Sequence, residues 1–336
     1  MLRDTQVSIE HRTSELRVGV IGVGYFGRHH CRLLSELAGV VLRGVSDTNP
    51  QAMDDVLRSR SAQDRAGGVA SELTASVDYR RILPLVDAVV IATPTATHCP
   101  IALECLRAGK HVFIEKPITS TLQEADLIIQ EAHRRGLITQ VGHVERYNPA
   151  FMRAQSLIDT PLCIESERFS PLIDRAFNID VTLDLMIHDI DIVLSIARSK
   201  VRSIKALGAR VLTQKIDMAR AWIEFDNGLN AVLMTGRLYP HKKRTLKVFH
   251  REFSLSVDLH NMALARHFKD GASIATEDIV IERSEPLKNE LMAFVNCVRD
   301  NIHPPVTALQ ARNALELTLL INDIIKENKA YESLMI

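Results

Sequence analysis

Three glycines, Gly22, Gly24 and Gly27, constrain the fold more than any other feature of the sequence. They lie in the segment GVGYFG, which follows the apolar run LRVGVI and leads into HHCRLLSEL. The apolar run predicts a β-strand covered on both faces, and the apolar spacing behind the glycines predicts a helix. Glycines at this spacing between a strand and a helix are typical of a turn that binds a dinucleotide.

Each glycine has a physical task in such a turn. Gly22 permits the tight bend, Gly24 lets the backbone approach a pyrophosphate, and Gly27 lets the helix pack closely on the strand. The helix begins at Tyr25 and Phe26, and the N–H groups of its first turn favour a phosphate. The segment therefore predicts a cofactor-binding turn that includes both aromatic residues.

Asp47 ends the next predicted strand, twenty residues beyond Gly27. A carboxylate at this place accepts hydrogen bonds from the adenosine ribose and repels a 2′-phosphate, which favours NAD over NADP. The alternative is a purely structural glycine turn. The strand, the helix and Asp47 together favour the NAD interpretation.

The alternation of strand and helix continues through the first half of the chain. The runs VDAVVIATP, KHVFIEKP and LITQVGHV are separated by helical segments, so they predict a doubly wound parallel sheet of the Rossmann type. We expect this NAD-binding domain to span residues 15–147. Residues 1–14 are polar, have no apolar core and are expected to form a flexible leader rather than a signal peptide.

From residue 148 to 336 the pattern changes to alternating runs joined by turn residues. Asn227-Gly228 lies between two such runs and predicts a hairpin. Further strands are expected in CIESERFS, VRSIKALGARVL, TLKVFHR, FSLSVDL and SIATEDIVIE, with helices at about 182–197, 286–300 and 306–327. The overall expectation is an α/β chain whose C-terminal α+β domain carries a large, mainly antiparallel, open-faced sheet.

Composition excludes several function classes. Lys plus Arg and Asp plus Glu number 41 each, so the chain has no overall basic field for nucleic acid or an anionic membrane. No apolar run approaches the ~20 residues of a membrane span. Five scattered cysteines without a CxxC pair argue against a disulfide framework or a zinc cluster, and favour a cytoplasmic protein without a metal site.

Polar residues follow two of the predicted parallel strands, at the sheet edge where open α/β folds bind ligands. Thr93-Pro94-Thr95 and His98 come after one strand and are expected to contact the cofactor, although helix capping with a solvated His98 is an alternative. Glu115 and Lys116 stand at the end of the next predicted strand. A lysine there stabilises a developing alkoxide, while Glu115 holds the nicotinamide ribose; the alternative is a surface ion pair.

Asp184 and His188 stand four residues apart in the apolar stretch VTLDLMIHDIDIVL, hence on one helix face. Neutral histidine suits proton abstraction near pH 7, and Asp184 is positioned to orient it. The alternatives are a buried structural pair and a metal site that includes Asp189 and Asp191. No second histidine stands at ligand spacing, so the metal interpretation is not favoured.

Taken together, GVGYFG, ATPTATH, EKP and the DxxxH pair, in this order and spacing, resemble the glucose–fructose oxidoreductase/inositol dehydrogenase/MocA family. The resemblance covers nearly the whole chain. It implies an NAD-dependent dehydrogenase of a sugar hydroxyl, with Lys116, Asp184 and His188 as the catalytic set and Arg146 as a further cofactor contact. The chain departs from the family by lacking the glycine-rich lead before the histidine.

Within the family, VGHVERYNPAF, DVTLDLMIHDIDIVL and LYPHKKRTLKVF resemble the bacterial branch that oxidises C3 of UDP-N-acetylglucosamine. The ketone then goes to a pyridoxal-phosphate aminotransferase for lipid A precursor synthesis. The branch motif has Phe where this chain has Tyr147. A diphosphate needs fixed cations, so Arg146, Lys242 and Arg244 are candidates. Further substrate candidates are Tyr147, Asn148, Arg168, Arg175, Arg237 and Lys243, although residues 242–244 could instead be a solvated hairpin end.

Three rival functions stay open from the sequence. A relative on the same fold could oxidise a free polyol such as inositol, or use bound NAD to hydrolyse a glycoside. A non-catalytic NAD-sensing protein is the rival of a different class, and the presence of Lys116, Asp184 and His188 argues against it. The family resemblance further implies a homodimer or homotetramer, formed through the open face of the second sheet.

Overall fold

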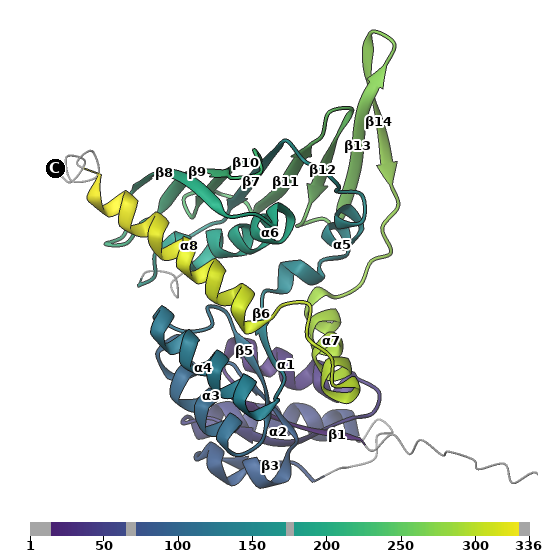
Figure 1. Ribbon diagram of the computed structural model, residues 1–336. Coiled ribbons are helices and arrows are strands. Elements are labelled where there is room, and N and C mark those ends of the chain that lie inside the picture. The colour runs from purple at the N-terminus through teal and green to yellow at the C-terminus, as the bar shows by residue number, and fades with distance from the viewer. Residues whose placement is uncertain (1–14, 65–71, 173–177, 329–336) are drawn as a thin grey trace, which may run out of the picture.

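The computed structural model describes residues 15–64, 72–172 and 178–328, and Figure 1 shows two sheets stacked along the long axis of the molecule. The first sheet has six parallel strands in the order β3-β2-β1-β4-β5-β6. Its strands are β1 (Leu16–Ile21), β2 (Val40–Ser46), β3 (Thr74–Ser76), β4 (Ala88–Ile91), β5 (His111–Glu115) and β6 (Thr139–Gly142). The order reverses between β1 and β4, so the sheet is doubly wound and the predicted Rossmann architecture is confirmed.

Helices cover both faces of this sheet. They are α1 (Tyr25–Glu36), α2 (Pro50–Asp64), α3 (His98–Arg107) and α4 (Leu122–Arg135), with short 3-10 turns η1 (Tyr79–Arg81), η2 (Leu83–Leu85) and η3 (Thr95–Thr97) between them. Strands β1, β4 and β5 are buried almost completely because both faces are covered. Helix α4 begins with a capping box between Thr121 and Glu124 and ends at Gly136 in the left-handed conformation.

The second sheet has eight strands in the order β14-β13-β12-β11-β7-β10-β9-β8. Only β7 and β10 pair in parallel, and all other neighbours are antiparallel, so the expected mainly antiparallel sheet is confirmed. The strands are β7 (Cys163–Phe169), β8 (Val201–Ala209), β9 (Met218–Phe225), β10 (Asn230–Gly236), β11 (Lys243–Phe249), β12 (Phe253–Asp258), β13 (Ala263–Asp270) and β14 (Ser273–Ile279).

One face of the second sheet packs on helices, and Figure 1 shows the opposite face without a helical cover. The covering elements are η4 (Val144–Tyr147), α5 (Pro149–Gln155), the π-helical turn η6 (Thr182–Met186), α6 (Ile187–Ala197) and α8 (Ala308–Glu327). On β9, Ala219, Ala221 and Ile223 are buried in this core, whereas Trp222 between them is 45% exposed. The strand alternation therefore gives the sheet one buried and one open face.

The C-terminal helices return to the first domain. Helix α7 (Pro286–Asp300) places Leu291 and Phe294 in the same apolar cluster as residues of β1 and α1. The beginning of α8 contributes Ala308 and Leu315 to the cluster around α3 and α4, while its later residues pack on the second sheet. Helix α7 thus packs on the N-terminal domain, and α8 packs on both domains at the place where they meet.

Candidate active site

The glycine turn has the geometry that its sequence predicts. Gly22 has φ +84°, and a Cβ on it would lie 2.7 Å from the carbonyl oxygen of Ala92. A Cβ on Gly27 would lie 1.8 Å from the oxygen of Gly22, whereas one on Gly24 would meet no atom within 4 Å. Gly22 and Gly27 are therefore required by the fold, and Gly24 keeps a space clear in front of the helix.

The N-terminus of α1 faces this clear space. Among the described residues no side chain caps α1 at Gly24, so the first N–H groups of this helix can donate to an anionic ligand. Asp47, at the end of β2, accepts a hydrogen bond from Val23 N at 2.8 Å and from Asn49 N at 2.9 Å. The uncapped turn and the nearby carboxylate fit the phosphate and ribose groups of NAD.

His98 connects two loops at the carboxyl edge of the first sheet. Its ring nitrogens lie 2.8 Å from the oxygen of Thr93 and 3.0 Å from the oxygen of Pro117, which follows a cis Lys116-Pro117 bond. The side chain is buried, and Thr97 makes no side-chain cap at α3. Burial excludes the alternative of a solvated histidine, and the cofactor contact of His98 stays a prediction.

Glu115 is held in place by a histidine from α1. His30 Nε2 lies 2.7 Å from Glu115 Oε1, and the histidine side chain is fully buried. Burial raises the pKa of the Glu115 carboxyl, but the hydrogen bond and charge of His30 outweigh burial and leave this pKa below its usual value. Glu115 is therefore a fixed carboxylate immediately before Lys116.

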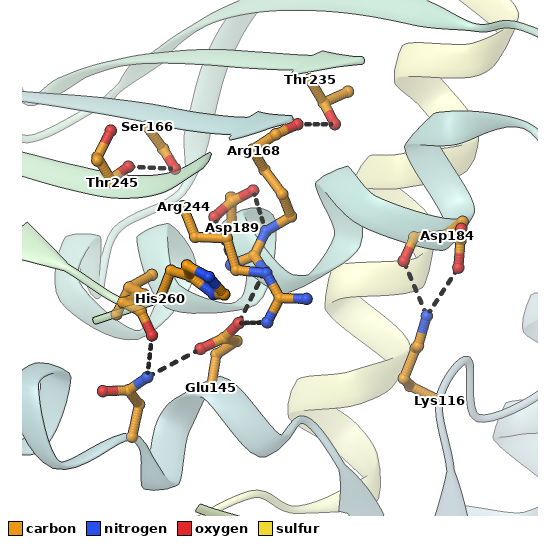
Figure 2. Close-up of polar contacts among 12 residues, drawn as sticks. Lys116, Glu145, Ser166, Arg168, Asp184, Asp189, Thr235, Arg244, Thr245 and His260 are labelled. Atoms are coloured by element: carbon orange, nitrogen blue, oxygen red, sulfur yellow. Dashed lines mark hydrogen bonds and ion pairs between the residues drawn. The ribbon is translucent and has the colours of Figure 1, made fainter. Parts of the chain in front are cut away.

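Lys116 and Asp184 meet across the boundary between the two domains (Figure 2). Lys116 Nζ donates to the backbone oxygen of Asp184 at 2.8 Å and to its Oδ1 at 3.3 Å. Asp184 belongs to the π-helical turn η6, which ends directly before α6. The spacing predicts that Asp184 orients His188, yet the structure brings Asp184 to Lys116, and His188 Nδ1 has no hydrogen-bond partner among the described residues.

His188 is only partly exposed and lies close to several cations. Burial lowers its pKa most, and the charges of Lys116, Arg168 and Arg244 lower it further, so this pKa falls well below its ordinary value. The imidazole is therefore neutral at pH 7. A neutral histidine beside a fixed ammonium group is suited to take a proton from a hydroxyl whose oxygen the lysine stabilises.

Comparison with known proteins agrees with this geometry. Residues 16–143 match an oxidoreductase family with an NAD-binding Rossmann fold, and residues 167–256 match the GFO/IDH/MocA C-terminal domain. UDP-N-acetylglucosamine 3-dehydrogenase of Acidithiobacillus ferrooxidans is 34% identical over 328 residues, which is 90% of this chain and 98% of the relative.

The chain belongs to the GFO/IDH/MocA family of oxidoreductases.

Further known proteins are also similar to the chain. The NAD⁺-dependent scyllo-inositol 2-dehydrogenase of Bacillus subtilis is 28% identical over 90% of this chain and 92% of its own length. A solved structure of the Acidithiobacillus ferrooxidans enzyme superimposes with a TM-score of 0.85 at 30% identity, covering 92% of this chain and 97% of that one. A putative myo-inositol dehydrogenase from Sinorhizobium meliloti, at 19% identity and a TM-score of 0.78, shows the same fold.

Two predicted substrate residues, Arg168 and Arg237, are buried in ion pairs, and Figure 2 shows those of Arg168. Arg168 binds both carboxylate oxygens of Asp189 at 2.8 and 3.0 Å, and Glu145 Oε1 at 2.7 Å. Arg237 donates to the backbone oxygens of residues 179 and 216 and lies 3.4 Å from Asp217. Both guanidinium groups are buried and bind oxygen atoms of the protein interior. The expectation that Arg168 and Arg237 hold a diphosphate therefore has no support from the structure.

The other predicted contacts are placed as follows. Asn148 caps α5 and donates to the oxygen of Leu259 at 2.8 Å, which is a structural role, and Tyr147 is buried. Arg146 faces Asp191 at 3.6 Å, and the exposed Lys243 pairs with Glu167 at 2.5 Å. Arg175 lies outside the described residues. The exposed aromatic residues of the glycine turn, Tyr25 and Phe26, stand at the start of α1.

Several residues of this site escape the sequence prediction. His30 shares the buried stripe of α1 with Gly27, Cys31 and Leu34, so a polar residue on an otherwise apolar helix face was the available signal. His143 follows β6, and Lys116 follows β5 at the same edge of the sheet. A polar residue directly after a predicted parallel strand was the available signal for His143. Glu145, which joins Arg168 and Arg244, had no comparable signal.

No group of three or more potential metal ligands occurs within residues 15–64, 72–172 and 178–328. In the same part of the chain, none of the helices combines the length and the apolar character that a bilayer crossing requires.

Proposed function

We propose that the chain oxidises the C3 hydroxyl of UDP-N-acetylglucosamine to a ketone in an NAD-dependent reaction. The observation that carries the dehydrogenase part is that Asp184 fixes the Lys116 ammonium at the carboxyl edge of the Rossmann sheet, while burial and then the charge of Lys116 lower the pKa of His188 and keep it neutral. The nucleotide sugar itself is supported by the similarity to the Acidithiobacillus ferrooxidans enzyme over nearly the full length of both chains.

In this mechanism His188 and Lys116 act on the same substrate hydroxyl. His188 takes the hydroxyl proton on Nε2, because its Nδ1 is buried. Lys116, held by the two oxygens of Asp184, donates to the hydroxyl oxygen and stabilises its developing negative charge. Bound NAD⁺ supplies the hydride acceptor.

Arg244 is the residue best placed to hold the charged part of the substrate. It lies on β11, is about one third exposed, and donates to the buried Glu145 at 3.2 Å. Its charge reaches His188, whose pKa it lowers together with burial and Lys116. A guanidinium fixed on one side and exposed on the other can bind a phosphate without first losing much freedom.

The proposed product also defines the next reaction. A 3-keto sugar nucleotide is an electrophile for an amine, so we propose that a pyridoxal-phosphate aminotransferase consumes it on the way to a 3-amino sugar for lipid A. This coupling draws an unfavourable oxidation forward because the ketone is removed.

The decisive experiment mixes purified protein with NAD⁺ and a panel of UDP-sugars and free sugars, and follows reduced nicotinamide. UDP-N-acetylglucosamine should react, and His188→Ala should cut kcat by roughly 10²- to 10⁴-fold while NAD binding stays intact. Turnover by His188→Ala at the normal rate would refute the assigned base. Reaction of inositol alone would favour the second candidate, a free polyol dehydrogenase, which the similarity to scyllo-inositol 2-dehydrogenase supports.

A further inference from the structure

His143 is the most unusual buried residue near the proposed base. It follows β6 at the carboxyl edge of the first sheet, its side chain is 1% exposed, and neither ring nitrogen has a hydrogen-bond partner among the described residues. A buried polar group without a partner is costly and therefore calls for a functional explanation. The mechanism above makes no use of it.

The ring of His143 faces the ring of His188. Their centroids lie 6.4 Å apart at an interplanar angle of 82°, and within the described part of the chain His188 Nδ1 is likewise buried without a partner. This separation is too long for a direct hydrogen bond between two imidazoles, so a proton that passes between the rings needs a bridging water. The side of His188 that faces away from the proposed substrate thus lies near a second group that can carry a proton.

A polar stripe continues from His188 along α6. Asp191 and Ser195 follow at helical spacings of three and four residues, and Arg198 ends the helix three residues later. Apart from Asp189, which binds Arg168, the other residues of the helix are apolar and pack in or against the core. Residues at this spacing occupy one face, so the stripe leads from the catalytic residues to the far end of α6.

Asp191 has the properties of the next proton acceptor. It is 2% exposed, its Oδ2 has no partner among the residues that the structure describes, and its Oδ1 lies 3.6 Å from Arg146. Burial lowers the pKa of His143, Asp191 is the largest opposing influence, Lys116 and Arg146 add to the lowering, and Glu115 raises it slightly. Lys116 on the substrate side repels a proton on His143, and Asp191 attracts it.

The far end of this stripe opens into a cavity of about 870 Å³. Its lining includes Arg146, Asp191, Ser195, Arg198 and Lys200. Arg198 and Lys200 are exposed, so the cavity communicates with bulk water. Asp191 therefore borders both the buried histidine pair and a solvent-accessible space.

We infer that His143 and Asp191 carry the substrate proton from His188 to the cavity behind α6. The inference rests on the proposed function of His188. The hydroxyl O–H bond breaks and the proton binds His188 Nε2, while Nδ1 releases a proton through water to His143. His143 then passes a proton to Asp191, which gives it to water, so one proton leaves for each hydride transferred. His143 and Asp191 are positioning residues that act through His188.

The test compares His143→Phe and Asp191→Asn with the unaltered protein at saturating NAD⁺ and UDP-N-acetylglucosamine. We expect kcat to fall roughly 10-fold or more in both variants, less than the loss of the base itself, and the solvent deuterium isotope effect to increase. Added imidazole should restore part of kcat in Asp191→Asn and leave the unaltered protein unchanged, because a small base in the cavity that Asp191 lines can replace the missing proton carrier.

His250→Phe is the matched control. Within the described part of the chain His250 also has two buried ring nitrogens without partners, but it stacks on Phe253 after β11, at the end of this strand that lies opposite to Lys243. This variant should keep the kcat, the isotope effect and the indifference to imidazole of the unaltered protein. In the protein without NAD, nitrogen NMR should show His143 titrating at lower pH in Asp191→Asn, because the attracting charge is gone.

The relay is refuted if both variants keep the normal kcat, isotope effect and lack of imidazole response while His188→Ala is inactive. Normal turnover by His188→Ala refutes the assigned base and the relay with it, whereas the proposed function itself fails if the unaltered protein does not oxidise UDP-N-acetylglucosamine. If His143→Phe fails to fold, Asp191→Asn decides the question, because it preserves the shape of the side chain.

Discussion

Lys116 influences the reaction both through its own charge and through His188. Burial and then the Lys116 ammonium lower the pKa of His188, and only the neutral imidazole accepts a proton. The acid limb of kcat/KM should therefore lie well below pH 6.5. Replacing Lys116 with Met removes a charge that favours the neutral form, so the pKa of His188 rises and the acid limb moves to higher pH.

The same Lys116→Met variant should lose roughly 10²- to 10³-fold in kcat, because the developing alkoxide loses its fixed cation. The measurement is the pH profile of kcat/KM for both proteins. Lys110→Met is the control, since Lys110 lies directly before β5, at its opposite end, and binds the oxygen of Val86. An acid limb that does not move in Lys116→Met would contradict the electrostatic coupling.

Arg244 tests the charge of the substrate. We expect Arg244→Gln to raise KM for UDP-N-acetylglucosamine roughly 10- to 100-fold, the value of a hydrogen bond to a charged group, without changing KM for NAD⁺. Lys247→Gln, three residues along the same strand and exposed, should change neither constant. Equal effects on the nucleotide sugar and on a free sugar would contradict a role at the diphosphate.

Alanine at two positions of the glycine turn should have opposite effects on stability and on NAD⁺ binding. Gly24→Ala adds a methyl group where no protein atom lies within 4 Å, so the free energy of unfolding of the protein without NAD should stay unchanged. The same methyl group occupies the space in front of α1, so the Kd for NAD⁺ should rise about 10-fold. Calorimetric titration measures this constant.

Gly27→Ala should behave in the reverse way. Its methyl group would stand 1.8 Å from the oxygen of Gly22, so the helix must move and the protein should lose about 1–3 kcal/mol of stability in urea unfolding. A stable Gly27→Ala protein, or an unstable Gly24→Ala protein, would contradict the roles assigned to the two glycines.

The ion cluster of Glu145, Arg168 and Asp189 joins η4, β7 and α6. Glu145→Gln should cost about 3–5 kcal/mol in urea unfolding, because Arg168 stays buried with one charged partner fewer. The control is Arg202→Gln, which removes the exposed pair with Asp226 and should have little effect. Equal stability of the two variants would show that the cluster does not hold these elements together.

At the scale of the whole molecule, the sequence predicts the strands, helices and turns that depend on local patterns of apolar and turn residues. The parallel alternation, the Asn227-Gly228 turn and the helices at 182–197 and 286–300 follow from apolar spacing, and the structure contains them. β13 was missed because Arg266, His267 and Lys269 interrupt its alternation near the edge of the sheet. Lys116 was correctly placed at the sheet edge, but its bond to Asp184 depends on how two domains meet, which no local pattern records.

The open face of the second sheet leads to the last prediction. Trp222 and Leu207 are 45% and 61% exposed on neighbouring strands, and an exposed apolar patch of this kind marks an interaction surface. We propose that two copies of the chain pair through this face. Sedimentation velocity should show a mass at least twice 37.6 kDa, and Trp222→Glu should shift it to the monomer while the circular dichroism spectrum stays that of the folded protein. The Met292→Glu control, on the exposed side of α7, should leave the mass unchanged, and a monomeric unaltered protein would refute the pairing.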